Sequence, residues 1–263
     1  MPTVDTPPLR QCVLAVSVLS DLDVMPSDHG VVLPGPSVVV VRWTAIRDAV
    51  GDHPADSALA RQRVGNLLRL HRVACDLGSS AAERFRSASR LVALPPGHAE
   101  HPGAGWTQEV LRGNALELGI GVQGLLGDPD RATPVPPSVL REIGVEAADW
   151  WPGLREHVER MGALSAARLT RDGLTGIVRP VGGCDVLALL SSSTLRRHLA
   201  EGDGTGMRAL AVPTRRRGWF DISQVDPAFV RAAWSLTDEP ERGSPVPLLI
   251  TADTVTLPFS LAE

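Results

Sequence analysis

The stretch GVVLPGPSVVVVRWTAIRDAV, residues 30–50, contains the pattern that decides the expected fold. An apolar run is followed by a Pro-Gly turn, by four consecutive valines and by a segment in which Thr44 can cap a short helix. Because β-branched residues favour strands, this order predicts a strand, a turn, a second strand and a helix.

Two later stretches follow the same order. Residues 177–199 read IVRPVGGCDVLALLSSSTLRRHL, which predicts a glycine turn, a strand over 186–190 and a helix that begins at the serines. Residues 208–234 predict a turn at Gly218 and a helix that starts with Asp226 and Pro227. The copies share little identity, so the pattern fits either a duplication or independent hairpins that precede helices.

Other segments predict the remaining elements. Apolar residues at helical spacing predict two long amphipathic helices, over 58–78 and 149–169. Apolar runs predict a strand over 12–19 and a closing hairpin over 247–259, while the glycine-interrupted pattern of 109–127 fits either a helix or a strand. We therefore expect an α+β fold with a mainly antiparallel sheet.

The expected domain organisation has a short tail and a globular part. Residues 1–10 are polar and proline-bearing, which is typical of a loose N-terminal tail. Residues 11–263 are expected to form one α+β globular unit, or two halves divided near the proline-rich segment 127–138.

The composition limits the class of partner. The chain of 263 residues has 26 basic and 30 acidic side chains, a net charge of −4, and every basic residue is arginine. This bias indicates a bacterial protein from a GC-rich genome. Because phosphate binding needs a positive surface, we do not expect nucleic acid or a membrane as the partner. Another protein is the favoured partner, and a small anionic ligand is the alternative.

The cysteines and the N-terminal pattern indicate a compartment. Cys12, Cys75 and Cys184 are odd in number and widely spaced, which is typical of reduced thiols. The apolar stretch follows Cys12, whereas a signal peptide would place it before the cysteine. No apolar stretch approaches the roughly 18 residues that a membrane span needs. We therefore expect a cytoplasmic protein.

The first candidate site lies around Cys184, which follows two glycines. A reactive thiolate needs a base, a positive charge or a helix N-terminus nearby, and the expected strand after Cys184 supplies no such group. A hairpin cysteine is the favoured interpretation. Ser191, Ser192 and Ser193 lie where a helix is expected to begin, so they could cap that helix or bind an anion, and capping is favoured.

Histidines provide two further candidate sites. His71 and Cys75 lie one turn apart on one predicted helix and His157 lies on the other, so the three could bind zinc if the helices touch. Buried cysteines and histidines are more often core residues, and we expect no metal and no cofactor. His98 and His101 lie in the loop 95–108 and could act as an acid–base pair, although ordinary loop residues are favoured.

The last candidate is the basic stretch before Trp219. Arg215, Arg216 and Arg217 could bind phosphates or an acidic protein while the tryptophan stacks on a base. The net negative charge of the chain weighs against nucleic acid.

These candidates lead to one main expectation and two alternatives. No catalytic motif is present, so we expect a binding or accessory protein that interacts with another protein. The first alternative is a hydrolase or transferase whose pocket joins the His98/His101 loop, Cys184 and the start of the serine-capped helix, with Arg179 holding an anionic substrate. The second is a protein that binds nucleic acid through the three arginines and Trp219.

Overall fold

The computed structural model of the protein describes residues 7–35, 38–171, 176–202, 204–220 and 224–258. Its α+β fold with antiparallel sheets confirms the predicted class. The chain divides into two compact units, here called unit 1 and unit 2. Unit 1 comprises 1–89, 99–106 and 120–150, and unit 2 comprises 90–98, 107–119 and 151–263. The proline-rich segment 127–138 lies inside unit 1.

Helix α3 (Ala58–Leu77) is the centre of unit 1, and its position confirms the helix predicted over 58–78. The Ser57 hydroxyl caps it by accepting a hydrogen bond from the Ala60 N–H at 3.1 Å. Leu67 and Leu68 are fully buried on its apolar face. The helices that pack on α3 are α1 (Pro7–Ser20), α2 (Trp43–Val50), α4 (Ala81–Ala88) and α5 (Pro137–Glu142).

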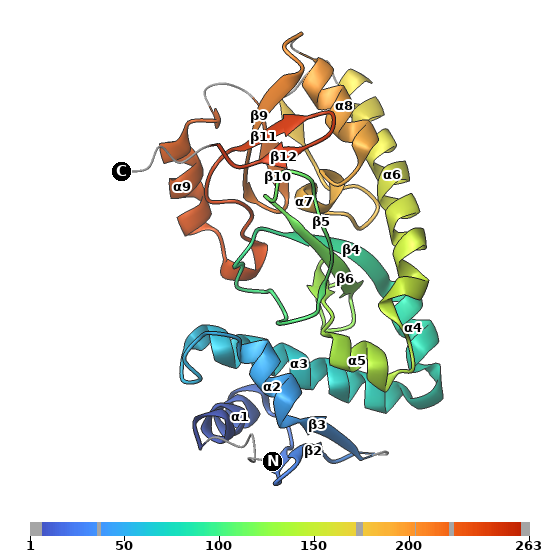
Figure 1. Ribbon diagram of the computed structural model, residues 1–263, viewed down its shortest axis with the longest axis vertical. Coiled ribbons are helices and arrows are strands. Elements are labelled where there is room, and N and C mark those ends of the chain that lie inside the picture. Colours follow the sequence, from blue (N-terminus) through green and yellow to red (C-terminus); the bar gives the residue numbers. More distant parts are fainter. Residues whose placement is uncertain (1–6, 36–37, 172–175, 203, 221–223, 259–263) are drawn as a thin grey trace. The chain divides into compact units, whose positions relative to one another are not determined.

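Unit 1 also contains a three-stranded antiparallel sheet with the order β1-β2-β3. Its strands are β1 (Met25–Pro26), β2 (Gly30–Leu33) and β3 (Val39–Arg42). Val32 pairs with Val40 and Val31 with Val41, as the stretch 30–50 predicted. Figure 1 shows β3 next to α2 and α3. Helix α2 begins at Trp43 with Arg42 as its N-cap, so the expected Thr44 cap is wrong.

The strand predicted over 12–19 is wrong, because this segment belongs to α1. Pro7 and Pro8 occupy the first turn of the helix, where their missing N–H groups leave no hydrogen bond broken. The buried side chains Leu9, Cys12, Val13 and Val16 follow helical spacing. Residues 7–10 are therefore helical, and residues 1–6 of the expected tail lie outside the described residues.

The segment 109–127, whose pattern fits either a helix or a strand, contains a strand. β6 (Glu117–Gln123) is the inner strand of a four-stranded antiparallel sheet with the order β4-β6-β5, in which β7 also pairs with β6. The other strands are β4 (Ser89–Leu94), β5 (Thr107–Val110) and β7 (Ala132–Pro134). Residues 117–119 of β6 belong to unit 2 and residues 120–123 to unit 1.

Unit 2 contains a five-stranded antiparallel sheet with the order β12-β11-β9-β10-β8. Its strands are β8 (Ile177–Val178), β9 (Met207–Thr214), β10 (Arg217–Trp219), β11 (Leu248–Thr251) and β12 (Val255–Thr256). Its helices are α6 (Ala147–Arg171, with residues 147–150 in unit 1), α7 (Val186–Leu189), α8 (Ser193–Glu201) and α9 (Pro227–Leu236). α8 contacts β9 and β11 (Figure 1). The predicted long helix, closing hairpin and Asp226-capped helix are confirmed.

Two predictions for unit 2 are wrong. The strand expected over 186–190 is the short helix α7, because Asp185 caps a Leu- and Ala-rich segment that favours helix. The turn expected at Gly218 lies instead at Arg215 and Arg216, and Gly218 is inside β10. The repeated strand-turn-strand-helix order therefore holds for 30–50 and 208–234 but not for 177–199.

No helix in the described ranges combines the length and the apolar character that crossing a membrane requires.

A substitution at Gly162 tests the close contact between α6 and α8. A Cβ at this position would lie 2.0 Å from the Ser192 Oγ, whereas a Cβ at Gly153 of the same helix would meet nothing within 4 Å. We expect Gly162→Ala to lower the free energy of unfolding by about 1–3 kcal/mol, because the added methyl group overpacks the contact. The matched Gly153→Ala should be neutral or stabilising by up to about 1 kcal/mol. Urea unfolding of both variants measures this difference, and an equal effect would contradict the contact.

Candidate functional site

Cys184 closes a tight glycine turn, as expected, but helix α7 follows it in place of the second strand of the predicted hairpin. Gly182 and Gly183 have φ angles of 57° and 80°, and the backbone groups of Val181 and Cys184 exchange two hydrogen bonds of 3.0 Å. The Cys184 side chain is fully buried. Burial and the neighbouring Asp185 carboxylate raise the pKa of its thiol to about 12. The group stays protonated and inaccessible, which are poor properties for a nucleophile.

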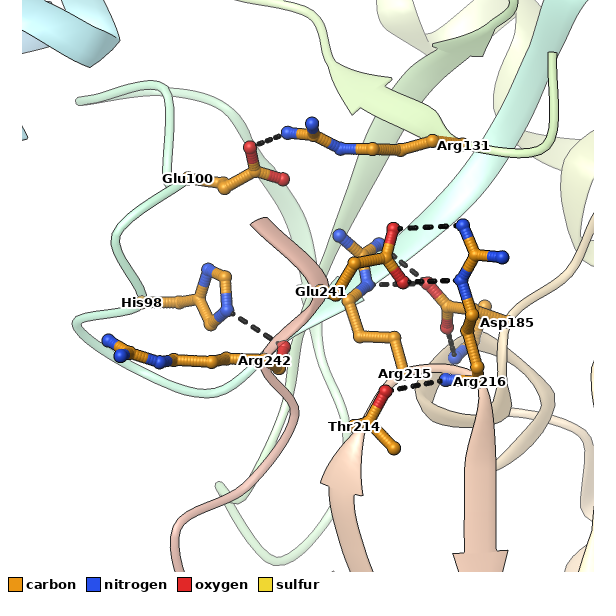
Figure 2. Close-up of polar contacts among 10 residues, drawn as sticks. His98, Glu100, Arg131, Asp185, Thr214, Arg215, Arg216, Glu241 and Arg242 are labelled. Carbon is orange, nitrogen blue, oxygen red and sulfur yellow. Dashed lines mark hydrogen bonds and ion pairs between the residues drawn. The ribbon is translucent and has the colours of Figure 1, made fainter. Parts of the chain in front are cut away.

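Asp185 is the polar centre of this region (Figure 2). One carboxylate oxygen accepts the Ala188 N–H at 2.8 Å and so caps α7. The other oxygen accepts two hydrogen bonds from the Arg215 guanidinium, at 2.7 Å from Nε and 2.5 Å from Nη2. The Arg215 side chain is only 5% exposed, so the Asp185 carboxylate balances a buried charge.

The backbone around Arg215 joins further segments to this pair. Its N–H donates to the Glu241 carbonyl and its carbonyl accepts from the Val186 N–H, both at 2.9 Å. The Arg216 guanidinium donates to the Glu241 carboxylate at 2.8 Å, and His98 Nε2 lies 3.1 Å from the Arg242 carbonyl (Figure 2). His98 is thus a buried member of a polar network in unit 2.

The predicted partner-binding arginines therefore divide into two groups. Arg215 and Arg216 form ion pairs within the fold, and Arg217 is exposed on β10. Trp219 packs edge-to-face on Phe229, with ring centroids 6.4 Å apart. The first two arginines would have to break these contacts before they could bind a phosphate or an acidic peptide.

The serines at the start of α8 hold an anion from the chain itself. The Ser192 hydroxyl and the Ser193 N–H each donate to the Glu159 carboxylate at 2.8 Å. The Ser192 side chain also caps α8, as predicted, and Ser191 is fully buried with its hydroxyl on the Ala188 carbonyl. Burial raises the pKa of Glu159, but these hydrogen bonds together outweigh burial and lower it below its usual value. The helix start does bind an anion, and that anion is Glu159 of α6.

Arg179, which was expected to hold an anionic substrate, and His101 belong to different units. Arg179 is exposed in unit 2. His101 belongs to unit 1, where its Nδ1 accepts the Gly103 N–H at 3.2 Å and its ring packs edge-to-face on Trp106. Burial and the charge of Arg63 lower the pKa of His101 to about 4, so the ring is neutral near pH 7.

The candidate metal ligands make ordinary contacts. His71 Nε2 lies 3.2 Å from the Ser138 hydroxyl, and Cys75 is buried on the same helix. His157 Nε2 lies 3.0 Å from the Gly182 carbonyl in unit 2. No group of three or more His, Cys, Asp or Glu side chains that could hold a metal ion occurs within the described ranges.

His71 and Ser138 also have the residue types of a base and its nucleophile. Burial, with a contribution from the Arg141 charge, lowers the pKa of His71 to about 4, which makes the imidazole a weak base. His71 is 3% exposed, so no substrate reaches the pair without an opening of α3 and α5. The contact is best explained as a buried histidine held neutral.

A hollow that sequence reasoning missed runs along α1. It has a volume of about 430 Å³ and is lined by Pro8, Gln11, Cys12, Ala15, Ala55, Asp56 and Arg61. A second, shallow depression continues it along the helix and is lined by Leu14, Ala15, Val18, Leu19 and Arg61. We call the two together the α1 groove.

The outer face of α1 is apolar although it is exposed. Leu14, Val18 and Leu19 are 46%, 84% and 74% exposed, and Arg10 is the only charged residue of the helix. The signal was in the sequence, because 7–20 has apolar residues on every side and almost no charge, but the segment was interpreted as a strand. A helix that is apolar all round is normally covered on all sides.

The comparisons with known proteins supply no relative: no family model matches the chain, and neither the curated proteins nor the solved structures contain a match.

The Asp185–Arg215 pair is expected to contribute far more to stability than the exposed Arg216–Glu241 pair. Asp185→Ala leaves the buried Arg215 charge uncompensated and removes the cap of α7, so the free energy of unfolding should fall by about 3–5 kcal/mol. Glu241→Ala removes an ion pair whose arginine is 57% exposed and should cost less than about 1 kcal/mol. Chemical denaturation measures the free energy of unfolding of both variants. Similar losses would contradict the role of Asp185 as the partner of a buried charge.

His71 gives a pH prediction. Its pKa is about 4 in the folded chain and 6.5 in the unfolded chain, so the unfolded chain binds the extra proton first as the pH falls. Protonation of His71 does not lower the free energy of unfolding well above pH 6.5, and it should lower it by about 3 kcal/mol as the pH falls to 4. His71→Gln should flatten this acid limb relative to the exposed-site control His29→Gln. Denaturation at a series of pH values tests it, and a limb of unchanged slope in His71→Gln would disprove it.

Proposed function

We propose that the protein is an interaction module, and that the α1 groove binds an amphipathic helix of a partner protein. The observation that carries this proposal is the exposed apolar face of α1 beside a hollow of about 430 Å³. Contiguous apolar surface next to a concavity is typical of protein-binding sites.

The shape of the groove favours a helix as the occupant. Leu14 and Val18 lie four residues apart and form one row along the helix axis, and Ala15 and Leu19 form the next row. An apolar stripe on a second helix, with side chains at positions i, i+3, i+4 and i+7, would match these rows by helix-in-groove packing.

The charge of the groove favours an acidic residue on that helix. Arg61 lines both parts of the groove and donates to the Asp56 carbonyl, which fixes its guanidinium at the rim. Asp56 lines only the hollow of about 430 Å³, whereas the depression beside Leu14 and Val18 is lined by Arg61 and by no acidic side chain. A partner carboxylate at the edge of the apolar stripe could therefore pair with Arg61 and set the orientation of the bound helix.

Catalysis and nucleic-acid binding receive less support. The polar groups that either function would need, among them Cys184, the α8 serines and Arg215, have partners inside the fold or are buried. The α1 groove, in contrast, is lined by the exposed apolar side chains Leu14, Val18 and Leu19.

A displayed library of helix-forming peptides tests the proposal. Panning against the full chain should enrich peptides with an apolar stripe and an acidic residue, and their synthetic forms should bind in the micromolar range by fluorescence anisotropy. Val18→Lys, at an exposed position, should raise the dissociation constant at least about tenfold because it places a charge in the apolar row. Arg61→Glu should weaken the acidic peptide and favour the same peptide with lysine in place of its acidic residue.

The matched control is Val40→Lys, an equivalent exposed change on β3, which should leave peptide binding unchanged. A library that yields no binder, or binders whose affinity is the same for Val18→Lys and the unaltered chain, would overturn the proposal.

A further inference from the structure

Strand β3 has an edge that no other strand covers within the described chain. In the order β1-β2-β3 it pairs with β2 on one side only, and no hydrogen bond from another element reaches Val39–Val41 in the described ranges. Natural sheets protect such edges with proline, lysine or a bulge. Residues 38–41 contain no proline and no charged side chain, the only charge in β3 is Arg42 at its end, and the β2–β3 ladder runs without a bulge.

The opposite edge of the same sheet is protected. β1 consists of Met25 and Pro26, and Pro26 has no N–H group to offer to another strand. β1 is also too short to template a partner strand. The two edges therefore differ, and only β3 is suited to pairing.

Both faces of the segment Val38–Val41 are apolar, and the exposed Arg42 ends its outer face. Val39 and Val41 are buried in unit 1, whereas Val38 and Val40 point the other way and are 69% and 46% exposed. Antiparallel strands with one solvated face normally alternate apolar and polar residues, and a continuous valine run is typical of a strand covered on both faces. The outer valines are therefore unexplained by the fold of one chain.

We infer that β3 pairs antiparallel with β3 of a second copy of this chain and forms a dimer. Pairing of identical antiparallel edges has two-fold symmetry, so each N–H that points to the free edge of one strand meets a carbonyl of the other without any further complementarity. The side-chain period of two places the outer residues of one copy opposite the outer residues of the other. Val38 and Val40 of both copies then form one apolar cross-strand cluster.

The same geometry sets the size and strength of the assembly. Because the β1 edge is blocked, pairing ends at two copies and does not continue into a fibre. The strand is only four residues long, and the interface is much smaller than the 20–30 residues per partner of a standard stable complex. We expect a weak dimer with a dissociation constant in the micromolar range.

Sedimentation equilibrium of the full chain over a range of concentrations tests the dimer. The average mass should rise from one copy towards two, and Val40→Lys should raise the dimer dissociation constant at least about tenfold, because like charges meet across the two-fold axis. A chain with both Val38→Cys and Val40→Cys should form an intermolecular disulfide under mild oxidation, because the pairing places the outer positions of the two copies opposite one another. The three native cysteines are buried and serve as the background in the unaltered chain.

The control variant is Val18→Lys, which disables the α1 groove and should leave the dimer intact, so failure of this inference and failure of the peptide-binding proposal are distinguishable. A single-copy mass at several hundred micromolar, a dimer that Val40→Lys leaves unchanged, or assembly beyond two copies would each overturn the inference.

Discussion

The carboxylate of Asp185 is the contact on which the polar structure of unit 2 depends. It caps α7 with one oxygen and neutralises the buried Arg215 with the other. Arg215 in turn fixes the β9–β10 turn and, through its backbone, the start of α7 and the segment that contains Glu241. A buried guanidinium costs several kcal/mol unless a carboxylate meets it, so one side chain holds three chain segments in register.

The general requirement that a buried charge or a helix end has a partner also explains why several candidate catalytic and ligand-binding residues have structural roles. The N-terminus of α8 attracts a negative charge and receives Glu159, and the tight turn that positions Asp185 also buries Cys184. Burial and the charge of Arg141 keep His71 neutral. The polar candidates Cys184, Ser192, Ser193 and Arg215 are thus buried or paired within unit 2, whereas α1 and β3 of unit 1 expose apolar side chains.

The sequence predictions are accurate where the deciding residues lie close together in the sequence, and they fail where distant segments decide the structure. The two strands and the helix of the stretch 30–50 were predicted correctly, although not the cap, because valines and a Pro-Gly turn act within a few residues. The segments 12–19 and 186–190 were misassigned because short apolar runs fit strand and helix equally, and the deciding features were Pro7 at a helix start and Asp185 as a cap. The serine cap was predicted, but its occupant Glu159 comes from 33 residues away and left no local trace. The α1 groove requires the helix and the loop at Ala55 together, so no single stretch revealed it.

The two apolar surfaces of unit 1 differ in what they can recognise. On α1 the backbone is consumed by the helix, so recognition must come from side-chain packing and from Arg61 at the rim, which selects a partner by its shape and charge. On β3 the backbone edge itself is available, and it accepts any extended strand of suitable face, of which an identical copy is the one always present at equal concentration. Dimerisation through β3 would give each assembly two α1 grooves. A partner with two helical segments could then bind both, and its avidity would exceed the affinity of either groove alone without any new contact.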